Sequence, residues 1–338
     1  IPTTRALAVV ATGEDILRDS LLPGAVLTRV AQSHIRIGTF QFFAARSDVA
    51  QIRALADYTI ARHDPDLAQA DNPYLALFDA VIARQARLIA QWMGVGFIHG
   101  VMNTDNMALS GETIDYGPCA FMEDYAPGTV FSSIDHGGRY AYGNQPLILG
   151  WNLARLAEAL LPLFDPDADR AVDLANDRLT GIAARYQDAW LAVMRAKLGL
   201  QGAEAGDAAL VEDLLSAMMG QGADWTLTFR RLATALGGDV GQVAPLFADA
   251  TAFRAWLPRW QARTAPDAAH RMARANPAVI PRNHLVEEAL SAATAGDMAP
   301  VQALLAALTD PFTDRPGDDR YTLPAPQGFG RYVTYCGT

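Results

Sequence analysis

The segment HGVMNTDNM, residues 99–107, is followed after five residues by TIDYGP, residues 113–118. Asp105, Asn106 and Asp115 flank a short apolar stretch that we predict to be a hairpin over Met107–Ile114. Such a hairpin would place its two ends side by side, and two carboxylates with an amide then form a candidate Mg²⁺ site, because Mg²⁺ prefers a few protein oxygens together with substrate phosphates. The alternative is that these residues form ordinary turns, since Asp, Asn and Gly are the commonest turn residues.

The elements around this region occur in the order of a protein-kinase catalytic lobe. A predicted helix over about residues 74–93, ended by Gly94, precedes the loop with His99 and Asp105, and Asp115-Tyr116-Gly117 stands where a kinase has D-F-G. A long irregular segment then extends to Pro146. No Arg precedes Asp105, and the amide follows it at once instead of five positions later. The order therefore disfavours a standard phosphotransferase kinase and favours a divergent kinase-like lobe. The helix is predicted from apolar residues at spacings of three and four, namely Leu75, Phe78, Ile82, Ala86, Ile89 and Met93.

The flanking sequence predicts an α+β fold that is predominantly helical. Residues 5–12 and 26–43 are rich in β-branched and aromatic residues and are predicted to be paired strands, separated by a turn at Pro23-Gly24. Ser47 is a candidate cap for a helix through Ala61. Helical patterning returns at Leu147 and continues beyond Asp165, while the Pro-, Gly- and Asp-rich tail from Asp310 is expected to be extended.

Composition excludes several classes of protein. The 338 residues are 51% hydrophobic and carry a net charge of −10, which argues against disorder and against a broad nucleic-acid-binding surface. Lys197 is the only lysine, so it is the single candidate for any reaction that requires a lysine side chain. The best membrane candidate, residues 146–164, is interrupted by polar residues, and no signal peptide is visible. We expect a soluble, cytoplasmic protein that binds neither nucleic acid nor membrane.

Several motifs together closely resemble the selenoprotein O (SelO) family along essentially the whole chain. This resemblance implies a kinase-like (pseudokinase) fold that binds ATP in a flipped orientation. It also implies a protein adenylyltransferase that transfers AMP to Ser, Thr or Tyr hydroxyls of proteins and releases pyrophosphate. The matching segments are residues 99–107, 113–118, 135–140 (DHGGRY), 144–146 with 151–153, 2–7 (PTTRAL), 29–31 with 33–34, 223–225 with 228–230, and 276–277 with 282–283.

The family's functional roles transfer to matching positions of this sequence. Asp105 resembles the general base that removes the hydroxyl proton, and Asn106 and Asp115 resemble the ligands of Mg²⁺, with Mn²⁺ as the alternative metal. Asp115 also lies near the nucleotide in this scheme. Arg29 and Arg36 resemble the arginines that hold the ATP phosphates, and a guanidinium suits that role because it binds phosphate through two parallel hydrogen bonds. Without the resemblance, an exposed strand face would explain both arginines.

The resemblance also implies a division of the chain. Residues 1–46 correspond to a remnant of the N-lobe strands, 47–165 to the catalytic lobe, 166–309 to a helical region and 310–338 to a tail. The family's glycine-rich loop, lysine and glutamate lie upstream of the segment that begins at Ile1, so we expect the 338-residue chain alone to be weakly active or inactive. A non-catalytic pseudokinase that binds nucleotide or metal is the second interpretation, and a true kinase is the third.

The two cysteines, Cys119 and Cys336, exclude a disulfide-rich scaffold and a cysteine-based zinc cluster. Cys336 matches the position where the family carries a terminal Cys or selenocysteine. Some bacterial members pair it with a loop cysteine, but the matching position here is Phe131. Two interpretations stay open: a bridge between Cys119 and Cys336, or a small buried Cys119 with a free Cys336.

Overall fold

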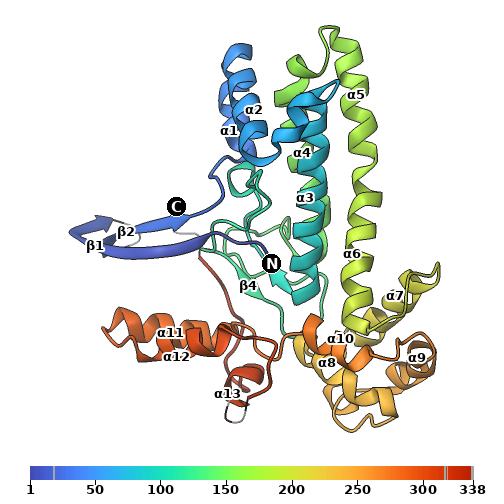
Figure 1. Cartoon of the computed structure of the whole chain (residues 1–338). Coiled ribbons are helices and arrows are strands. Elements are labelled where there is room, and N and C mark those ends of the chain that lie inside the picture. Colours follow the sequence, from blue (N-terminus) through green and yellow to red (C-terminus); the bar gives the residue numbers. More distant parts are fainter. Residues whose placement is uncertain (18–19, 316, 318, 336–338) are drawn as a thin grey trace.

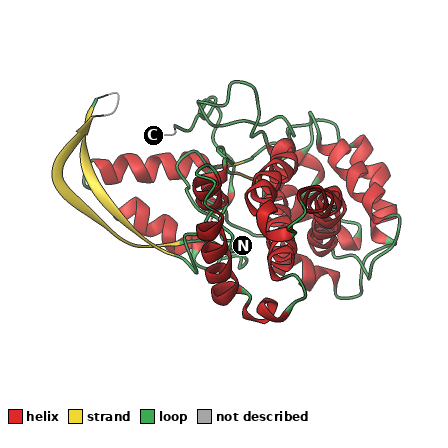
Figure 2. Cartoon of the chain, turned by 90° about the horizontal axis from the view of Figure 1, so that it is seen from above, coloured by secondary structure: helices red, strands yellow, loops and turns green. Residues whose placement is uncertain are grey.

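A protruding hairpin of two strands marks the N-terminal part of the chain (Figures 1 and 2). The computed structural model describes residues 1–17, 20–315, 317 and 319–335. In it, β1 (Arg5–Leu17) pairs antiparallel with β2 (Leu21–Val30). The predicted pairing of the two N-terminal apolar stretches is confirmed. The predicted turn at Pro23-Gly24 is wrong, because both residues lie inside β2 beside an irregularity in the register, where a proline costs no ladder hydrogen bond.

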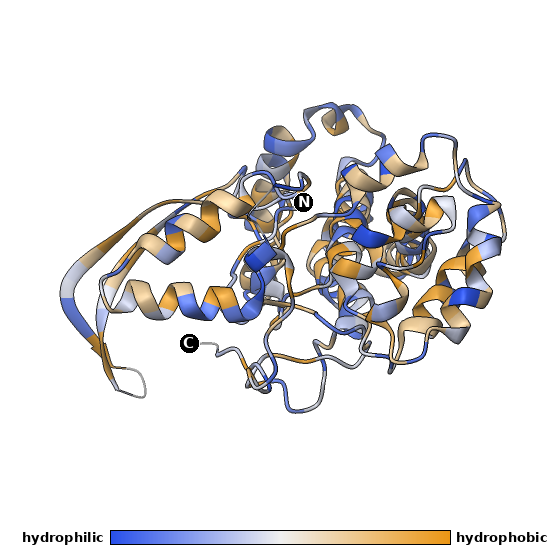
Figure 3. Ribbon diagram, turned by 90° about the horizontal axis from the view of Figure 1, so that it is seen from below, coloured by the Kyte–Doolittle hydropathy of each residue, from blue (hydrophilic) through white to orange (hydrophobic). Residues whose placement is uncertain are grey.

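The hairpin leaves most of its apolar side chains in contact with solvent. Leu7, Val9 and Leu21 are each about two-thirds exposed or more, and Figure 3 shows hydrophobic residues along both strands. The hairpin is paired only within itself among the described residues, so its two outer edges keep unpaired backbone groups.

The strand predicted to continue through residue 43 ends at Val30, and α1 (Ile37–Ala44) follows it. This part of the prediction is wrong, because the β-branched and aromatic residues of positions 37–44 lie in a helix. Ile37 and Phe40 lie one turn apart and are both fully buried. The Thr39 hydroxyl accepts the backbone N–H of the N-cap residue at 3.1 Å and so stabilises the first turn.

The next helix, α2 (Val49–His63), begins one residue later and ends two residues later than predicted. Its cap is Asp48, whose carboxylate accepts the N–H of Gln51 at 3.0 Å, and not Ser47. The short 3₁₀ helix η1 (Pro65–Gln69) connects α2 to the helix that follows it.

Three long helices, α3 (Pro73–Val95), α4 (Gln145–Phe164) and α6 (Ile182–Leu198), run side by side through the largest hydrophobic core (Figure 1). All six apolar positions predicted for the first of these helices are buried, which confirms that stripe. The helix ends two residues later than predicted, at Gly96, whose φ of 73° is the left-handed conformation of a C-cap.

By length and composition alone, residues Tyr142–Phe164 are apolar enough to cross a membrane, although polar residues interrupt them. More than half of this segment is buried inside the protein, against α1, α3 and α5. It therefore behaves as a core helix of the bundle.

The helical character predicted beyond Asp165 is confirmed. The last long pair, α11 (Asn283–Thr294) and α12 (Ala299–Leu308), packs mainly on itself through its own small apolar cluster and lies apart from the bundle (Figure 1). The predicted extended tail contains one short helix, α13 (Asp319–Thr322). Besides one short helix in the polar region, the remaining helices are η3 (Tyr142–Asn144), α5 (Ala168–Thr180), α7 (Asp207–Met218), α8 (Trp225–Arg231), η4 (Leu232–Gly237), η5 (Ala244–Leu246), α9 (Thr251–Gln261) and α10 (Ala268–Ala275).

Candidate active site

The polar region begins after α3 with the two-residue strand β3 (Phe97–Ile98), which pairs with β4 (Ala120–Phe121). Asp105 and Asn106 lie in the short 3₁₀ helix η2 (Thr104–Asn106). An antiparallel bridge joins Met107 to Thr113, with a tight turn between them. The predicted hairpin therefore exists, and it places the end of η2 beside the segment that leads into Asp115.

Three side chains of α3 donate hydrogen bonds to this hairpin. Arg84 donates from Nε to the carbonyl of Leu109 at 3.0 Å, and Gln85 donates to the carbonyl of Ala108 at 2.6 Å. Two turns further along the helix, the Trp92 indole donates to the Thr113 hydroxyl at 2.9 Å. Two of these contacts reach the hairpin backbone and the third reaches the Thr113 side chain, so the hairpin has little freedom to move against α3.

Side chains of α4 hold the other half of the loop. The Gln145 amide donates to the carbonyl of Phe97 at 2.9 Å and accepts the N–H of His99 at 3.1 Å. Asn152 donates to the carbonyl of Met102 at 2.9 Å. Both residues are fully buried and belong to the motif segments at 144–146 and 151–153, so these motifs position the site from outside it.

His99 links the two loops that carry the proposed metal ligands. Its Nε2 contacts the carbonyl of Ile114 at 2.8 Å, and its Nδ1 accepts the N–H of Val101 at 3.4 Å. A carbonyl can only accept, so Nε2 carries the proton. Complete burial lowers the pKa of His99, against an opposing effect of the Asp115 charge. Both nitrogens of the neutral ring are thus used in ordering the loops.

Asn106 is almost fully buried, and its amide nitrogen donates to the carbonyl of Val101 at 2.9 Å. This bond fixes the side chain so that Oδ1 is the free atom, with no protein donor among the residues that the structure describes. Asp115 is half-buried and adopts a φ of 66°. That left-handed conformation costs a non-glycine residue roughly 1–2 kcal/mol, and such strain concentrates at functional sites.

The donor set suits a hard divalent cation. Asn106 Oδ1 and the Asp115 carboxylate are oxygen ligands, and Mg²⁺ accepts one or two such groups when phosphates and water supply the rest. Within residues 1–17, 20–315, 317 and 319–335, no three His, Cys, Asp or Glu side chains form a metal cluster. The chemistry of Asn106 and Asp115 is compatible with a bound Mg²⁺ ion.

Asp105 is exposed, and the first turn of α1 lies against it. The Arg36 guanidinium donates from Nη1 to the backbone carbonyl of Asp105 at 2.9 Å. Arg36 Nε is buried and has no hydrogen-bond partner among the described residues. Arg29 is half-buried near the end of β2, opposite Ala6. Neither arginine forms an ion pair within the described part of the chain.

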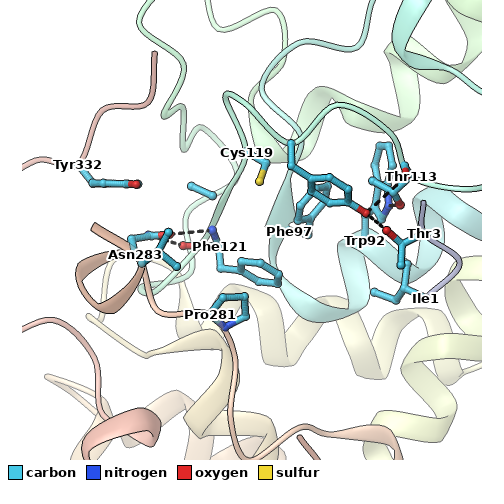
Figure 4. A pocket seen from close by; sticks show the side chains of 13 residues that line it. Ile1, Thr3, Trp92, Phe97, Thr113, Cys119, Phe121, Pro281, Asn283 and Tyr332 are labelled. Atoms are coloured by element: carbon cyan, nitrogen blue, oxygen red, sulfur yellow. Dashed lines mark hydrogen bonds between the residues drawn. The ribbon is translucent and has the colours of Figure 1, made fainter. Parts of the chain in front are cut away.

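A cavity of about 420 Å³ adjoins the Asp115-Tyr116-Gly117 segment (Figure 4). Its lining is largely apolar and includes five aromatic side chains, and the Tyr116 hydroxyl contacts the hydroxyl of Thr3 at one edge. The Cys119 thiol also lines it, and burial raises the pKa of that thiol to about 12, so the sulfur stays protonated and unreactive. The alternative partner, Cys336, lies outside the described residues. The main aromatic walls are Trp92, Phe97, Tyr116, Phe121 and Tyr332.

The positioning residues Gln85, Gln145 and Asn152 were not identified from the sequence. Each is a fully buried amide on the side of α3 or α4 that is otherwise lined by buried apolar residues. A polar residue at a buried helical position needs a partner, so this pattern could have identified them as loop anchors.

Comparison with known proteins now identifies the family. The sequence profile described as "Protein adenylyltransferase SelO" matches residues 1–309. A "Protein nucleotidyltransferase YdiU" of Cereibacter sphaeroides strain KD131 is 68% identical over 340 residues, which is all of this chain and 70% of that protein. Proteins of the same name from Mycobacterium sp. strain KMS and Pseudarthrobacter chlorophenolicus are 58% and 56% identical over the same shares. The chain belongs to the SelO family of protein adenylyltransferases and is a protein nucleotidyltransferase.

Proposed function

We propose that the protein transfers AMP from ATP to Ser, Thr or Tyr hydroxyls of protein substrates in a Mg²⁺-dependent reaction. The observation that carries this proposal is the His99 linkage, which ties the Asn106 loop to the residue before Asp115 inside the matched family region. In this proposal the Asn106 and Asp115 oxygens, the Asp105 carboxylate and the Arg36 guanidinium act on one bound nucleotide. In this proposal residues 47–165 form a kinase-like lobe.

In the proposed reaction, the Asp105 carboxylate removes the proton of the attacking hydroxyl. The hydroxyl oxygen forms a bond to the α-phosphorus of ATP while the bond from that phosphorus to the bridging oxygen of pyrophosphate breaks. The electron pair of that bond leaves with pyrophosphate, and the proton stays on Asp105 until solvent removes it. The exposure of Asp105 supports this role, because a protein substrate has to reach it.

The other residues hold the nucleotide. Asn106 Oδ1 and the Asp115 carboxylate would bind Mg²⁺, which when bound neutralises phosphate charge. The Arg36 and Arg29 guanidinium groups would donate to phosphate oxygens, Arg36 while its Nη1 remains on the Asp105 carbonyl. We expect the ligand oxygens of Asn106 and Asp115 to approach within roughly 3–4 Å of each other when they share a Mg²⁺ ion, given Mg–O distances of ~2.1 Å.

The position of the transferred label tests the reaction type. Incubation of the protein, as its gene encodes it, with Mg²⁺ and ATP labelled at the α-phosphorus should label a protein substrate. ATP labelled at the γ-phosphorus should leave that substrate unlabelled. Transfer of the γ label would establish a kinase instead, and transfer of neither label, with ATP still bound, would establish a nucleotide-binding pseudokinase.

A further inference from the structure

The glycine in the first turn of α1 lies directly against the Asp105 side chain. A Cβ placed on Gly38 would lie 2.9 Å from Asp105 Cγ, 3.5 Å from its backbone nitrogen, and closer still to Oδ1. Non-bonded carbon atoms are normally separated by about 3.5–4.0 Å, so no side chain fits at position 38 while the carboxylate stays in place. The helical backbone itself does not require glycine here, because the φ of Gly38 is not positive.

The backbones on both sides of this contact are fixed, so only the Asp105 side chain can move. The η2 segment is tied to the start of α1 by the Arg36 guanidinium on the Asp105 carbonyl and by the Ile37 N–H on the Met107 carbonyl at 3.0 Å. On the other side, α1 is fixed because Ile37 and Phe40 are fully buried in the main core. The shortest way to relieve a clash at position 38 is therefore to rotate the Asp105 carboxylate away.

We propose that Gly38 is a positioning residue whose missing side chain leaves the space that the Asp105 carboxylate occupies. The inference rests on the proposed role of Asp105 as the general base. Gly38 does not touch the substrate in this proposal and acts only by setting the direction of the carboxylate. A displacement of about 1 Å at a reacting group lowers a rate about 10²-fold, so Gly38→Ala should lower kcat by about that factor and leave the KM for ATP nearly unchanged.

Gly150→Ala is the matched control, because a Cβ at this position of α4 meets nothing within 4 Å. Alanine favours a helix over glycine, so neither variant should lower the melting temperature. The protein as its gene encodes it is assayed for AMP transfer, ATP affinity and thermal unfolding. If Gly38→Ala keeps the wild-type melting temperature but has a lower kcat, the result supports the positioning role of Gly38. If the folded variant has an unchanged kcat, the proposal is wrong.

A double-mutant cycle separates this proposal from the one on which it rests. If Gly38 acts through Asp105, the Gly38→Ala change should cause no further loss in an Asp105→Ala background. A further loss of about 10²-fold there would show that Gly38 acts by another route. If Asp105→Ala alone leaves the rate unchanged, the base assignment itself is wrong, and the comparison identifies which of the two proposals has failed.

Discussion

The single lysine provides a sensitive test of the packing between the bundle and the C-terminal helices. Lys197 is 3% exposed, and its Nζ donates to Asn276 Oδ1 at 2.9 Å. The Nζ also lies 4.2 Å from the ring centre of Phe229. No carboxylate pairs with it in the described ranges, and burial lowers the pKa of Lys197 from 10.5 to about 7.

The sign of the resulting pH dependence follows from proton counts. Between pH 7 and 10.5 the unfolded chain carries a proton on Lys197 that the folded chain lacks, so the free energy of unfolding rises with pH by about 1.4 kcal/mol per unit. From pH 7.5 to 9 the gain is about 2 kcal/mol. Below pH 7 both states are protonated, and this contribution to stability is at its minimum.

Lys197→Met removes the titrating group and serves as the reference. Urea unfolding of both proteins, followed by circular dichroism at pH 7.5, 8.2 and 9, gives the difference between their free energies of unfolding. We expect this difference to shift in favour of the wild type by about 2 kcal/mol over that range. Titration of other groups, such as Cys119, occurs in both proteins and cancels. A difference that stays constant with pH would show that Lys197 remains charged in the folded protein and would refute the reasoning.

Three further predictions concern the site. Asp105→Ala should lower the rate of AMP transfer by a factor of ~10²–10⁴ with little change in nucleotide affinity. Asp115→Ala should lose both Mg²⁺-dependent nucleotide binding, measured by calorimetry, and AMP transfer, measured with the label. If the two variants behave alike, the division of roles between Asp105 and Asp115 is wrong. Trp92→Phe removes the indole donor to Thr113 and should lower the free energy of unfolding by about 1 kcal/mol, as urea denaturation will show. Thr334→Val removes the hydroxyl that donates to the buried Pro118 carbonyl at 2.7 Å. Amide hydrogen exchange should therefore become faster at residues 131–133, which pair with Thr334. An unchanged exchange rate would mean that the tail does not order this loop.

The sequence alone predicted the elements whose pattern is local. The apolar stripe of α3 identified that helix because its period is set by neighbours along the chain. By contrast, residues 37–44 contain β-branched and aromatic residues that suit a strand equally well, and only burial of Ile37 and Phe40 against other helices selects α1. The prediction of a turn at Pro23-Gly24 was wrong for a related reason, since an irregular strand tolerates the same two residues.

For the candidate site, too, the sequence predicted one part, the identity of the residues, and did not predict the other, their geometry. Motif resemblance selected Asp105, Asn106 and Asp115, while their geometry depends on contacts that span long distances in the sequence. Asn152 reaches Met102 across 50 residues, and Gly38 meets Asp105 only after α1 packs against η2. Such contacts leave no periodic signal, because each is a single pair defined by the tertiary structure.

The anchoring of α11 has a consequence for synthesis of the chain. Asn283 accepts the N–H of Phe121 at 3.1 Å and donates to its carbonyl at 2.8 Å, so it pairs with β4 much as the backbone of a third strand would. These residues are 162 positions apart. At 5–20 residues per second, a ribosome needs roughly 8–32 s to proceed from one to the other. During that interval β4 lacks the partner that pairs with the Phe121 backbone in the finished fold, so its edge stays open until Asn283 has been synthesised.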